Sequence, residues 1–281
     1  MNALKVSGVC KRYPSFALED VSFTMPAGTI MGLIGVNGAG KTTTLKAILG
    51  HLRTEAGSIE LFGKPFAPDA LAGRAEIGCV SGGADYFPHK KLKAITDATR
   101  GFFPDWDEEI YRTLLRRFRL DEQKRVCELS AGMKVKYQLA LALSHHARLL
   151  ILDEPTSGLD PVSRDELLEL FLTLRDAQGA SVLFSTHITS DLEKCAQYIT
   201  YLQNGRVLLT GERRALLARY LVVSAPTLTE EQRGLLLGLK RHPEQVSGLL
   251  PVEYRDRFTP ELCAPATLED MMVYLEREAL R

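Results

Sequence analysis

One stretch, GVNGAGKT at residues 35–42, constrains the fold of this chain more than any other. It matches G-x-x-x-x-G-K-[ST], a glycine-rich loop whose backbone N–H groups surround phosphates. Residues 29–34 before it form an apolar run that suits a buried parallel strand, and residues 41–49 after it suit a helix that ends at Gly50. A strand, a glycine loop and a helix N-terminus together predict a site for the β- and γ-phosphates of a nucleotide.

We call residues 35–42 the phosphate loop. Lys41 would place a positive charge beside the phosphates, and the Thr42 hydroxyl would ligate Mg²⁺. The alternative is a plain glycine loop between strand and helix, but the local context favours the phosphate site. The nucleotide-binding residues expected in this region are Gly35, Asn37, Gly38, Ala39, Gly40, Lys41, Thr42 and Thr43.

Composition argues against several classes of protein. Lys+Arg and Asp+Glu both number 35, so the net charge is zero and no global field favours nucleic acid or an anionic membrane. No apolar run approaches the roughly 18 residues of a membrane span, and the first residues lack a signal-peptide core. The 5 cysteines are scattered without a C-x-x-C motif, which favours a reducing cytoplasm and no metal site. We expect no nucleic-acid partner.

Alternating strand-like and helix-like segments predict an α/β core. Residues 84–146 have helical signals, including a helix that starts at an Asp105 cap. Asn204 and Gly205 predict a tight hairpin turn. Besides residues 29–34, we expect strands at residues 3–12, 18–25, 58–62, 76–80, 149–152, 181–185, 198–203 and 206–210.

Acidic residues follow the apolar run 149–152 directly. Ligands of open α/β sheets bind at the carboxyl ends of the strands, so these acids should lie beside the phosphate loop. Asp153 would hold Mg²⁺, and Glu154 would polarise the attacking water as general base. The alternative is a pair of helix-capping residues. His187 follows the strand 181–185 onto the same edge, where it would contact the γ-phosphate or the attacking water; a structural histidine is the alternative.

Two further residues are candidates for nucleotide contact. Ser130 suits the N-cap of the helix that follows it, and a helix N-terminus is a second anion site, although most such serines are purely structural caps. Tyr13 would stack on an adenine ring, since every base has a π-face. Packing of this tyrosine against the edge of a sheet explains its position equally well.

Together these features resemble the ATP-binding subunits of ABC transporters over residues 3–218. The resemblance rests on the phosphate loop, residues 129–133 (LSAGM, the signature segment), the acidic strand 149–154, the loop 157–160, His187 and Tyr13. It implies a RecA-like P-loop NTPase core within a domain at 1–218. That domain would include an N-terminal antiparallel β-subdomain and an inserted helical subdomain at about 84–146.

The resemblance also implies a mechanism and partners. Two subunits, identical or different, would close head to tail on two ATP molecules bound with Mg²⁺. The signature segment of one would then cap the γ-phosphate held by Lys41 of the other. A transmembrane permease would dock beside residues 84–146 and hold the subunit at the cytoplasmic face of the cell membrane. The nucleotide-binding residues added by the resemblance are Ser130, Ala131, Gly132, Met133 and Asp160.

Residues 103–108, 129–134 and 266–272 resemble the ABC-2-type exporters linked to antibiotic efflux and cell-envelope responses. One departure matters. The family's glutamine after the strand 76–80, which contacts Mg²⁺ and the partner, aligns with Gly82. Glycine lacks that side chain, which puts metal coordination and coupling through this position in doubt.

Residues 219–281 lie beyond the ATPase pattern and suggest a small α+β appendage. We expect strands at 221–223 and 246–250 and helices at 228–240 and 266–279. The appendage would serve dimerisation, partner docking, ligand regulation or packing alone. Two other functions remain open: a soluble ABC ATPase that acts on ribosomes or DNA, and an ATP-binding regulatory module. The first usually needs two ATPase halves, coiled coils or zinc modules, and this sequence has none of these.

Overall fold

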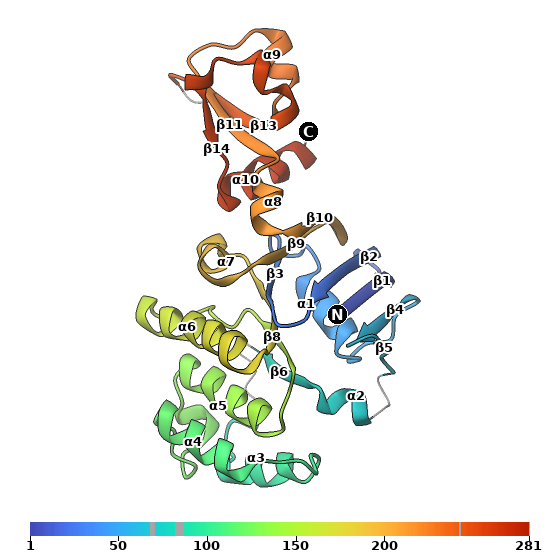
Figure 1. Ribbon diagram of the computed structural model, residues 1–281, viewed down its shortest axis with the longest axis vertical. Helices are drawn as coiled ribbons and strands as arrows, with labels where there is room; N and C mark the ends of the chain where they lie inside the picture. Colours follow the sequence, from blue (N-terminus) through green and yellow to red (C-terminus); the bar gives the residue numbers. More distant parts are fainter. Residues whose placement is uncertain (68–70, 82–86, 242, 281) are drawn as a thin grey trace.

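The computed structural model describes residues 1–67, 71–81, 87–241 and 243–280 (Figure 1). They form three sheets and the helices between them, and the predicted α/β P-loop fold is confirmed. Gly82 lies outside the described residues. Among the described helices, none has the length and apolar character that crossing a bilayer requires.

The central sheet has six strands in the order β10-β9-β3-β8-β7-β6, and all neighbours are parallel except β10 and β9. Every residue of β3 and β8 is buried, as expected for strands inside a parallel sheet. The strands are β3 (Ile30–Ile34), β6 (Ile77–Ser81), β7 (Leu149–Asp153), β8 (Ser181–Thr186), β9 (Tyr198–Gln203) and β10 (Arg206–Glu212). The helices beside this sheet include α1 (Lys41–Ile48), α6 (Pro161–Gln178) and α7 (Thr189–Cys195).

A second, antiparallel sheet forms from the first part of the chain, in the order β2-β1-β4-β5. Alternate residues of β2 are buried, as the partial alternation of its sequence predicts. The elements are β1 (Asn2–Tyr13), β2 (Phe16–Pro26), β4 (Ala56–Leu61) and β5 (Lys64–Pro65), and α2 (Leu71–Ala75) leads back to β6.

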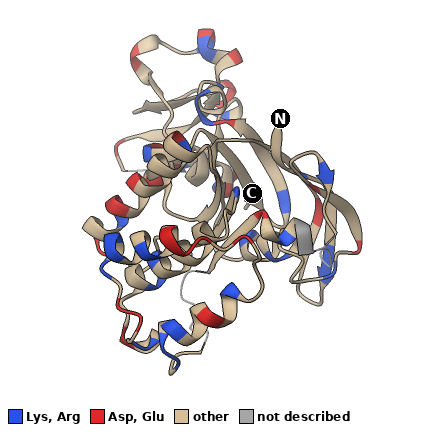
Figure 2. Ribbon diagram, turned by 60° about the horizontal axis from the view of Figure 1, so that its bottom comes forward, with Lys and Arg blue, Asp and Glu red and all other residues tan. Residues whose placement is uncertain are grey.

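The helical region contains α3 (Leu92–Arg100), α4 (Glu108–Phe118), the short 3₁₀ helix η1 (Val126–Glu128) and α5 (Ala131–Ser144). The predicted cap at Asp105 is wrong. The side chain of Asp107 accepts a hydrogen bond from the Ile110 N–H, and α4 therefore begins at Glu108. Basic and acidic residues are interspersed along these helices, so charges of one sign are not gathered on one face (Figure 2).

A third sheet, in the order β12-β13-β11-β14, lies at one end of the molecule (Figure 1). The predicted helix 228–240 is wrong: only α9 forms, and β12 follows it. Gly238 has φ +62, and a Cβ there would lie 2.0 Å from the Tyr274 carbonyl oxygen, so the chain bends where a helix would continue. The elements are α8 (Arg213–Leu217), β11 (Tyr220–Ala225), α9 (Glu230–Gly234), β12 (Leu237–Arg241), β13 (Val246–Pro251), η2 (Val252–Arg257), η3 (Pro260–Leu262) and β14 (Cys263–Pro265).

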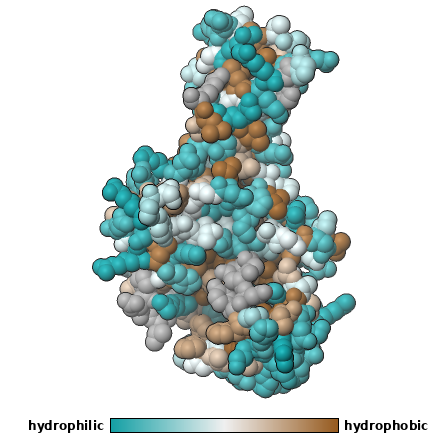
Figure 3. All heavy atoms as spheres, turned by 180° about the vertical axis from the view of Figure 1, so that it is seen from behind, coloured by the Kyte–Doolittle hydropathy of each residue, from teal (hydrophilic) through white to brown (hydrophobic). Residues whose placement is uncertain are grey.

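The helix α10 (Leu268–Ala279) joins this third sheet to the central one. Met271 is fully buried in the same apolar cluster as Ile199 of β9. The hydroxyl of Tyr201 in β9 donates to Glu276 at 2.6 Å. Hydrophobic side chains are visible at this narrow junction on the back face (Figure 3). The predicted domain boundary after residue 218 stays a prediction, because this cluster extends across it.

Replacing Met271 by alanine tests this junction. Met271 is 0% exposed, so Met271→Ala should lower the free energy of unfolding by about 2–5 kcal/mol in urea denaturation. Val273 on the same helix is 38% exposed, and Val273→Ala should change the free energy of unfolding by about 0.5 kcal/mol or less. Equal losses from the two variants would contradict the packing of α10.

Candidate nucleotide-binding site

The phosphate loop connects the end of β3 to the start of α1. Gly40 is the N-cap of α1 and has φ 107, a conformation that L side chains rarely adopt. At Gly35, a Cβ would lie 2.3 Å from the Leu202 carbonyl oxygen. A Cβ on Gly38 would have no other atom within 4 Å, so the backbone there is open to a ligand. These three glycines give the loop the shape of a phosphate cradle.

Lys41 is the buried cation of the site. Its side chain is 7% exposed, and Nζ donates hydrogen bonds to the carbonyl oxygens of Gly35 at 2.9 Å and Val36 at 3.3 Å. Glu154 Oε1 lies 3.5 Å from the same nitrogen. A partly desolvated ammonium attracts anions more strongly than an exposed one, because less water screens its charge.

The two predicted acids lie at the carboxyl end of β7, next to β8. Thr42 Oγ1 donates to Asp153 Oδ1 at 3.2 Å, which brings the two predicted metal ligands together. Ser185 of β8 also binds this carboxylate: its hydroxyl donates to Asp153 Oδ1 at 2.6 Å and accepts from the Glu154 N–H at 2.9 Å. Ser185 was not predicted from sequence, because its contacts depend on the pairing of Asp153 with Ser185 across β7 and β8.

His187 reaches the same edge from the end of β8. Its Nδ1 lies 3.0 Å from Glu154 Oε2, so Glu154 contacts Lys41 through one carboxylate oxygen and His187 through the other. Glu154 has φ 48, an uncommon conformation for a residue other than glycine. The backbone thus turns sharply at Glu154, directly after the strand.

Lys41, Glu154 and His187 line a cavity of about 700 Å³, within the range of small-molecule sites. The lining residues are Ser15, Phe16, Asn37, Gly38, Gly40, Lys41, Thr42, Thr43, Glu154, Ser157 and His187. Another cavity of about 710 Å³ lies between α4 and residues 178–180, which precede β8. It is therefore at the amino ends of the strands, away from the phosphate loop.

Tyr13 is not among the residues that line the nucleotide cavity, although it lies in the same sheet as β2. Its side chain is 45% exposed, and Lys11 Nζ lies 5.7 Å from the centre of its ring. Phe16 is the aromatic residue that lines the cavity. A Cβ at Gly40 would lie 2.8 Å from its ring, so Phe16 packs against the phosphate loop. Phe16, three residues beyond Tyr13, was not predicted from sequence, and the contact of Tyr13 with adenine stays a prediction.

The signature segment occupies a different place. Ser130 is the N-cap of α5, and its hydroxyl accepts from the Met133 N–H at 3.3 Å, as predicted. None of residues 130–133 lines the cavity of the phosphate loop. A Cβ at Gly132 would lie 3.5 Å from Leu159 Cδ2, so the segment lies against the loop 157–160.

Asp160 caps α6 and is exposed. Its carboxylate accepts from the N–H groups of Val162 and Ser163, both at 3.0 Å. The hydroxyl and amide of Ser163 hold the pKa of this carboxyl below its usual value. Asp160 therefore fixes the start of α6 beside the signature segment.

A family model described as ABC transporter matches residues 18–157. The Nod factor export ATP-binding protein I of Rhizobium johnstonii (strain DSM 114642 / LMG 32736 / 3841) is 35% identical over 226 residues, covering 76% of this chain and 71% of that protein. The chain belongs to the ABC transporter family. The ABC-type transporter ATP-binding protein EcsA of Bacillus subtilis (strain 168) is 36% identical over 199 residues, covering 69% of this chain and 80% of EcsA.

Solved structures agree with this ABC assignment. An ATP-binding subunit of an ABC transporter superposes with a TM-score of 0.68 at 30% identity, covering 77% of this chain and 92% of that one. A dimeric ATP-binding cassette bound to ADP and phosphate superposes with a TM-score of 0.65 at 20% identity, covering 74% and 98%, and shows the same fold. The predicted activity, an ABC subunit that binds and hydrolyses ATP, is confirmed at the level of the family.

Ser185 offers a test of how this ABC ATPase positions its acids. Ser185→Ala removes the hydroxyl that binds Asp153 and the Glu154 N–H, so we expect kcat for ATP hydrolysis to fall about tenfold while ATP still binds. Ser181→Ala is the matched control, because Ser181 is equally buried at the other end of β8, where its hydroxyl accepts from the Gly28 N–H. If both variants lose activity equally, Ser185 acts only through stability.

Proposed function

We propose that this chain is the ATPase subunit of an ABC exporter: two copies close on ATP and Mg²⁺ and drive a separate transmembrane permease. Glu154 carries the proposal. Its carboxylate lies between Lys41 Nζ at 3.5 Å and His187 Nδ1 at 3.0 Å, on the edge of the cavity that the phosphate loop forms. A general base for hydrolysis must be within reach of both the phosphate site and the attacking water.

Each residue has a proposed role in the reaction. The loop amides and Lys41 bind the phosphates, and Glu154 takes the proton of the attacking water. His187 orients Glu154 and contacts the γ-phosphate. When bound, Mg²⁺ neutralises charge on the phosphate oxygens. Thr42 and Asp153 would hold it, since hydroxyl and carboxylate oxygens within 3.2 Å of each other are the ligand types it prefers.

The position of the signature segment supports a dimer. Residues 130–133 start a helix whose N-terminus suits an anion, yet they do not line the cavity of their own phosphate loop. A second copy, turned head to tail, would supply these residues to each nucleotide.

Two observations support an exporter permease as the partner. The relatives named above are a Nod factor export protein and an ABC-type transporter protein. Phe87 and Phe102, on either side of α3, are 67% and 76% exposed, which suits burial against another protein. Docking there would hold the subunit at the cytoplasmic face of the membrane. Gly82 has no side chain to replace the family's glutamine, so other residues would have to make the contact with the permease.

Variants of Glu154 and Lys41 test the proposal. Glu154→Gln removes the base, so hydrolysis should fall by about 10²–10⁴-fold, while ATP still binds and a dimer accumulates in gel filtration with ATP and Mg²⁺. Lys41→Ala removes the charge at the phosphates, so ATP binding should weaken about 10–100-fold in a titration with a fluorescent ATP analogue.

The result also separates the alternatives. A Glu154→Gln protein that stays monomeric with ATP and hydrolyses it at the normal rate would exclude Glu154 as the base. A wild-type protein that binds ATP without turnover, alone or with its co-purified permease, would instead favour a regulatory module.

A further inference from the structure

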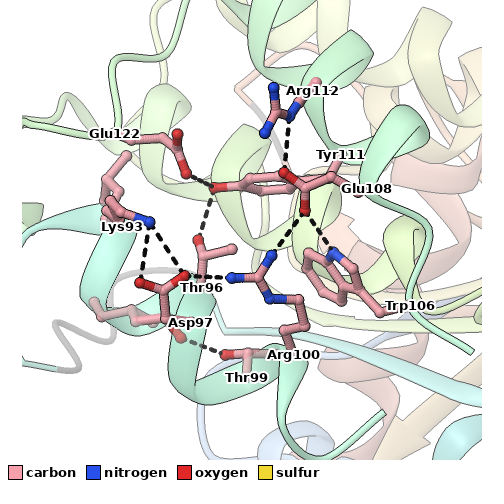
Figure 4. A network of polar contacts seen from close by, with 12 residues as sticks. Lys93, Thr96, Asp97, Thr99, Arg100, Trp106, Glu108, Tyr111, Arg112 and Glu122 are labelled. Carbon is pink, nitrogen blue, oxygen red and sulfur yellow. Dashed lines mark hydrogen bonds and ion pairs between the residues drawn. The ribbon is translucent and has the colours of Figure 1, made fainter. Parts of the chain in front are cut away.

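Three buried hydroxyl groups meet inside the helical region, away from the nucleotide cavity. Thr96 of α3, Tyr111 of α4 and Tyr137 of α5 are 2%, 1% and 4% exposed. Thr96 Oγ1 lies 2.7 Å from the Tyr111 hydroxyl and 2.9 Å from the Tyr137 hydroxyl (Figure 4 shows Thr96 and Tyr111). One threonine therefore links two other helices through hydrogen bonds in an otherwise apolar core.

These three hydroxyl groups have two further acceptors, the Leu92 carbonyl and the Glu122 carboxylate. Tyr137 donates its proton to the carbonyl oxygen of Leu92 at 2.9 Å. Thr96 is then the donor to Tyr137, and the one proton of Tyr111 goes either to Thr96 at 2.7 Å or to the Glu122 carboxylate at 3.2 Å, since each hydroxyl has a single proton. Burial raises the pKa of both tyrosines, so they keep those protons. Bonds in such a chain strengthen one another, and Thr96 is its central member.

Tyr137 lies two turns into α5, the helix that the signature segment begins. Residues seven positions apart lie on the same face of a helix, so Tyr137 lies below Ser130 on one side of α5. Its hydroxyl binds Leu92 and Thr96, which are one turn apart at the start of α3. The first turns of α5 and of α3 are therefore connected directly.

A backbone connection runs in parallel. Residues 88–93, which lead into α3, lie beside residues 122–127, which lead into the signature segment. The hydrogen bonds run from Leu92 N to Lys124 O at 2.9 Å, from Lys93 N to Glu122 O at 3.0 Å, from Val126 N to Lys90 O at 3.2 Å, and from Cys127 N to Pro88 O at 2.9 Å. Residues 88–93 thus contact the chain on both sides of the signature segment, through backbone hydrogen bonds before it and through the Leu92 carbonyl, which accepts from Tyr137, after it.

Ion pairs brace the outer side of the same unit. Arg100 of α3 contacts Asp97 at 2.6 Å and Glu108 of α4 at 3.2 Å, and the Trp106 indole N–H donates to Glu108 at 3.1 Å (Figure 4). These exposed contacts are screened by water and contribute little. The buried hydrogen bond between Thr96 and Tyr137 is therefore the side-chain contact that joins α3 to α5.

We propose that Thr96 is a positioning residue: its hydroxyl makes α3 and α5 move as one body, so that a partner that displaces residues 88–93 re-aims the signature segment. The consequence for catalysis rests on the proposed function, because a re-aimed signature segment matters when it closes on the nucleotide of a second copy. The mechanical link itself exists in the single subunit and is measurable there.

Thr96→Val is the decisive variant. It keeps the shape of the side chain and removes the hydroxyl. Each tyrosine keeps its other partner, Leu92 for Tyr137 and Glu122 for Tyr111, so no buried hydroxyl loses its last hydrogen bond. Thr96→Ser keeps the hydroxyl and should restore wild-type behaviour. Thr99→Val is the matched control, because the Thr99 hydroxyl binds only the Ile95 carbonyl of its own helix in the described contacts.

Two measurements on the full chain test the link. In the monomer without nucleotide, hydrogen exchange of residues 131–137 should be about tenfold faster in Thr96→Val, since the first turns of α5 open more easily. In a Glu154→Gln background, the ATP-induced dimer should be about tenfold weaker, because fewer molecules hold the signature segment in the competent position. ATP affinity of the monomer should not change, since the phosphate loop is untouched.

The outcomes are distinct. If Thr96→Val behaves as Thr99→Val does in hydrogen exchange, or if Thr96→Ser fails to restore the wild-type rate, the positioning role is wrong. If exchange changes as expected but the parent Glu154→Gln chain forms no dimer with ATP, the link stands and the proposed dimer fails. Tyr137→Phe, which removes the bonds to both Thr96 and Leu92, should speed exchange at least as much as Thr96→Val, and wild-type exchange would overturn the link.

Discussion

The chemistry of this chain depends on the parallel pairing of β8 with its two neighbours, β3 and β7. Parallel strands deliver their carboxyl ends to one edge of the sheet. The register then places Asp153 opposite Ser185, while Ile34, the residue before the phosphate loop, pairs with Thr186. Segments more than a hundred residues apart in sequence supply one cavity for this reason. A slip in either register would separate the cation from its carboxylate.

The residues visible from sequence were those that follow apolar runs or sit in glycine-rich turns. Lys41, Asp153, Glu154 and His187 were predicted and lie together. Ser185 was missed because a serine inside a buried strand looks like any small residue until the neighbouring strand is known. Phe16 was not predicted but lines the cavity, because local sequence does not tell which aromatic residue beside a turn packs on the phosphate loop, and the contact of Tyr13 with adenine stays a prediction.

The third sheet shows a different limit. The segment 228–240 contains Leu235, Leu236 and Leu237 in succession, and such a run suits a helix and a strand equally. Thr229 caps α9 at the start of this segment, but α9 lasts a single short turn. Pairing of β12 with β13 and the bend at Gly238 decide the outcome, and both depend on residues far along the chain. Tertiary packing therefore overrode the local helical signal.

The position of α10 in the sequence affects the order in which parts of the protein can fold during synthesis. It follows every other described element in the sequence, yet it fills the same apolar cluster as β9, and the Leu268 N–H donates to Glu193 of α7, directly after His187. During synthesis, the phosphate loop, the acids and the histidine all leave the ribosome before the helix that covers their supporting strands. The nascent chain therefore holds all the residues of the nucleotide cavity before α10 covers the apolar surface of β9, and that surface stays exposed until α10 is made.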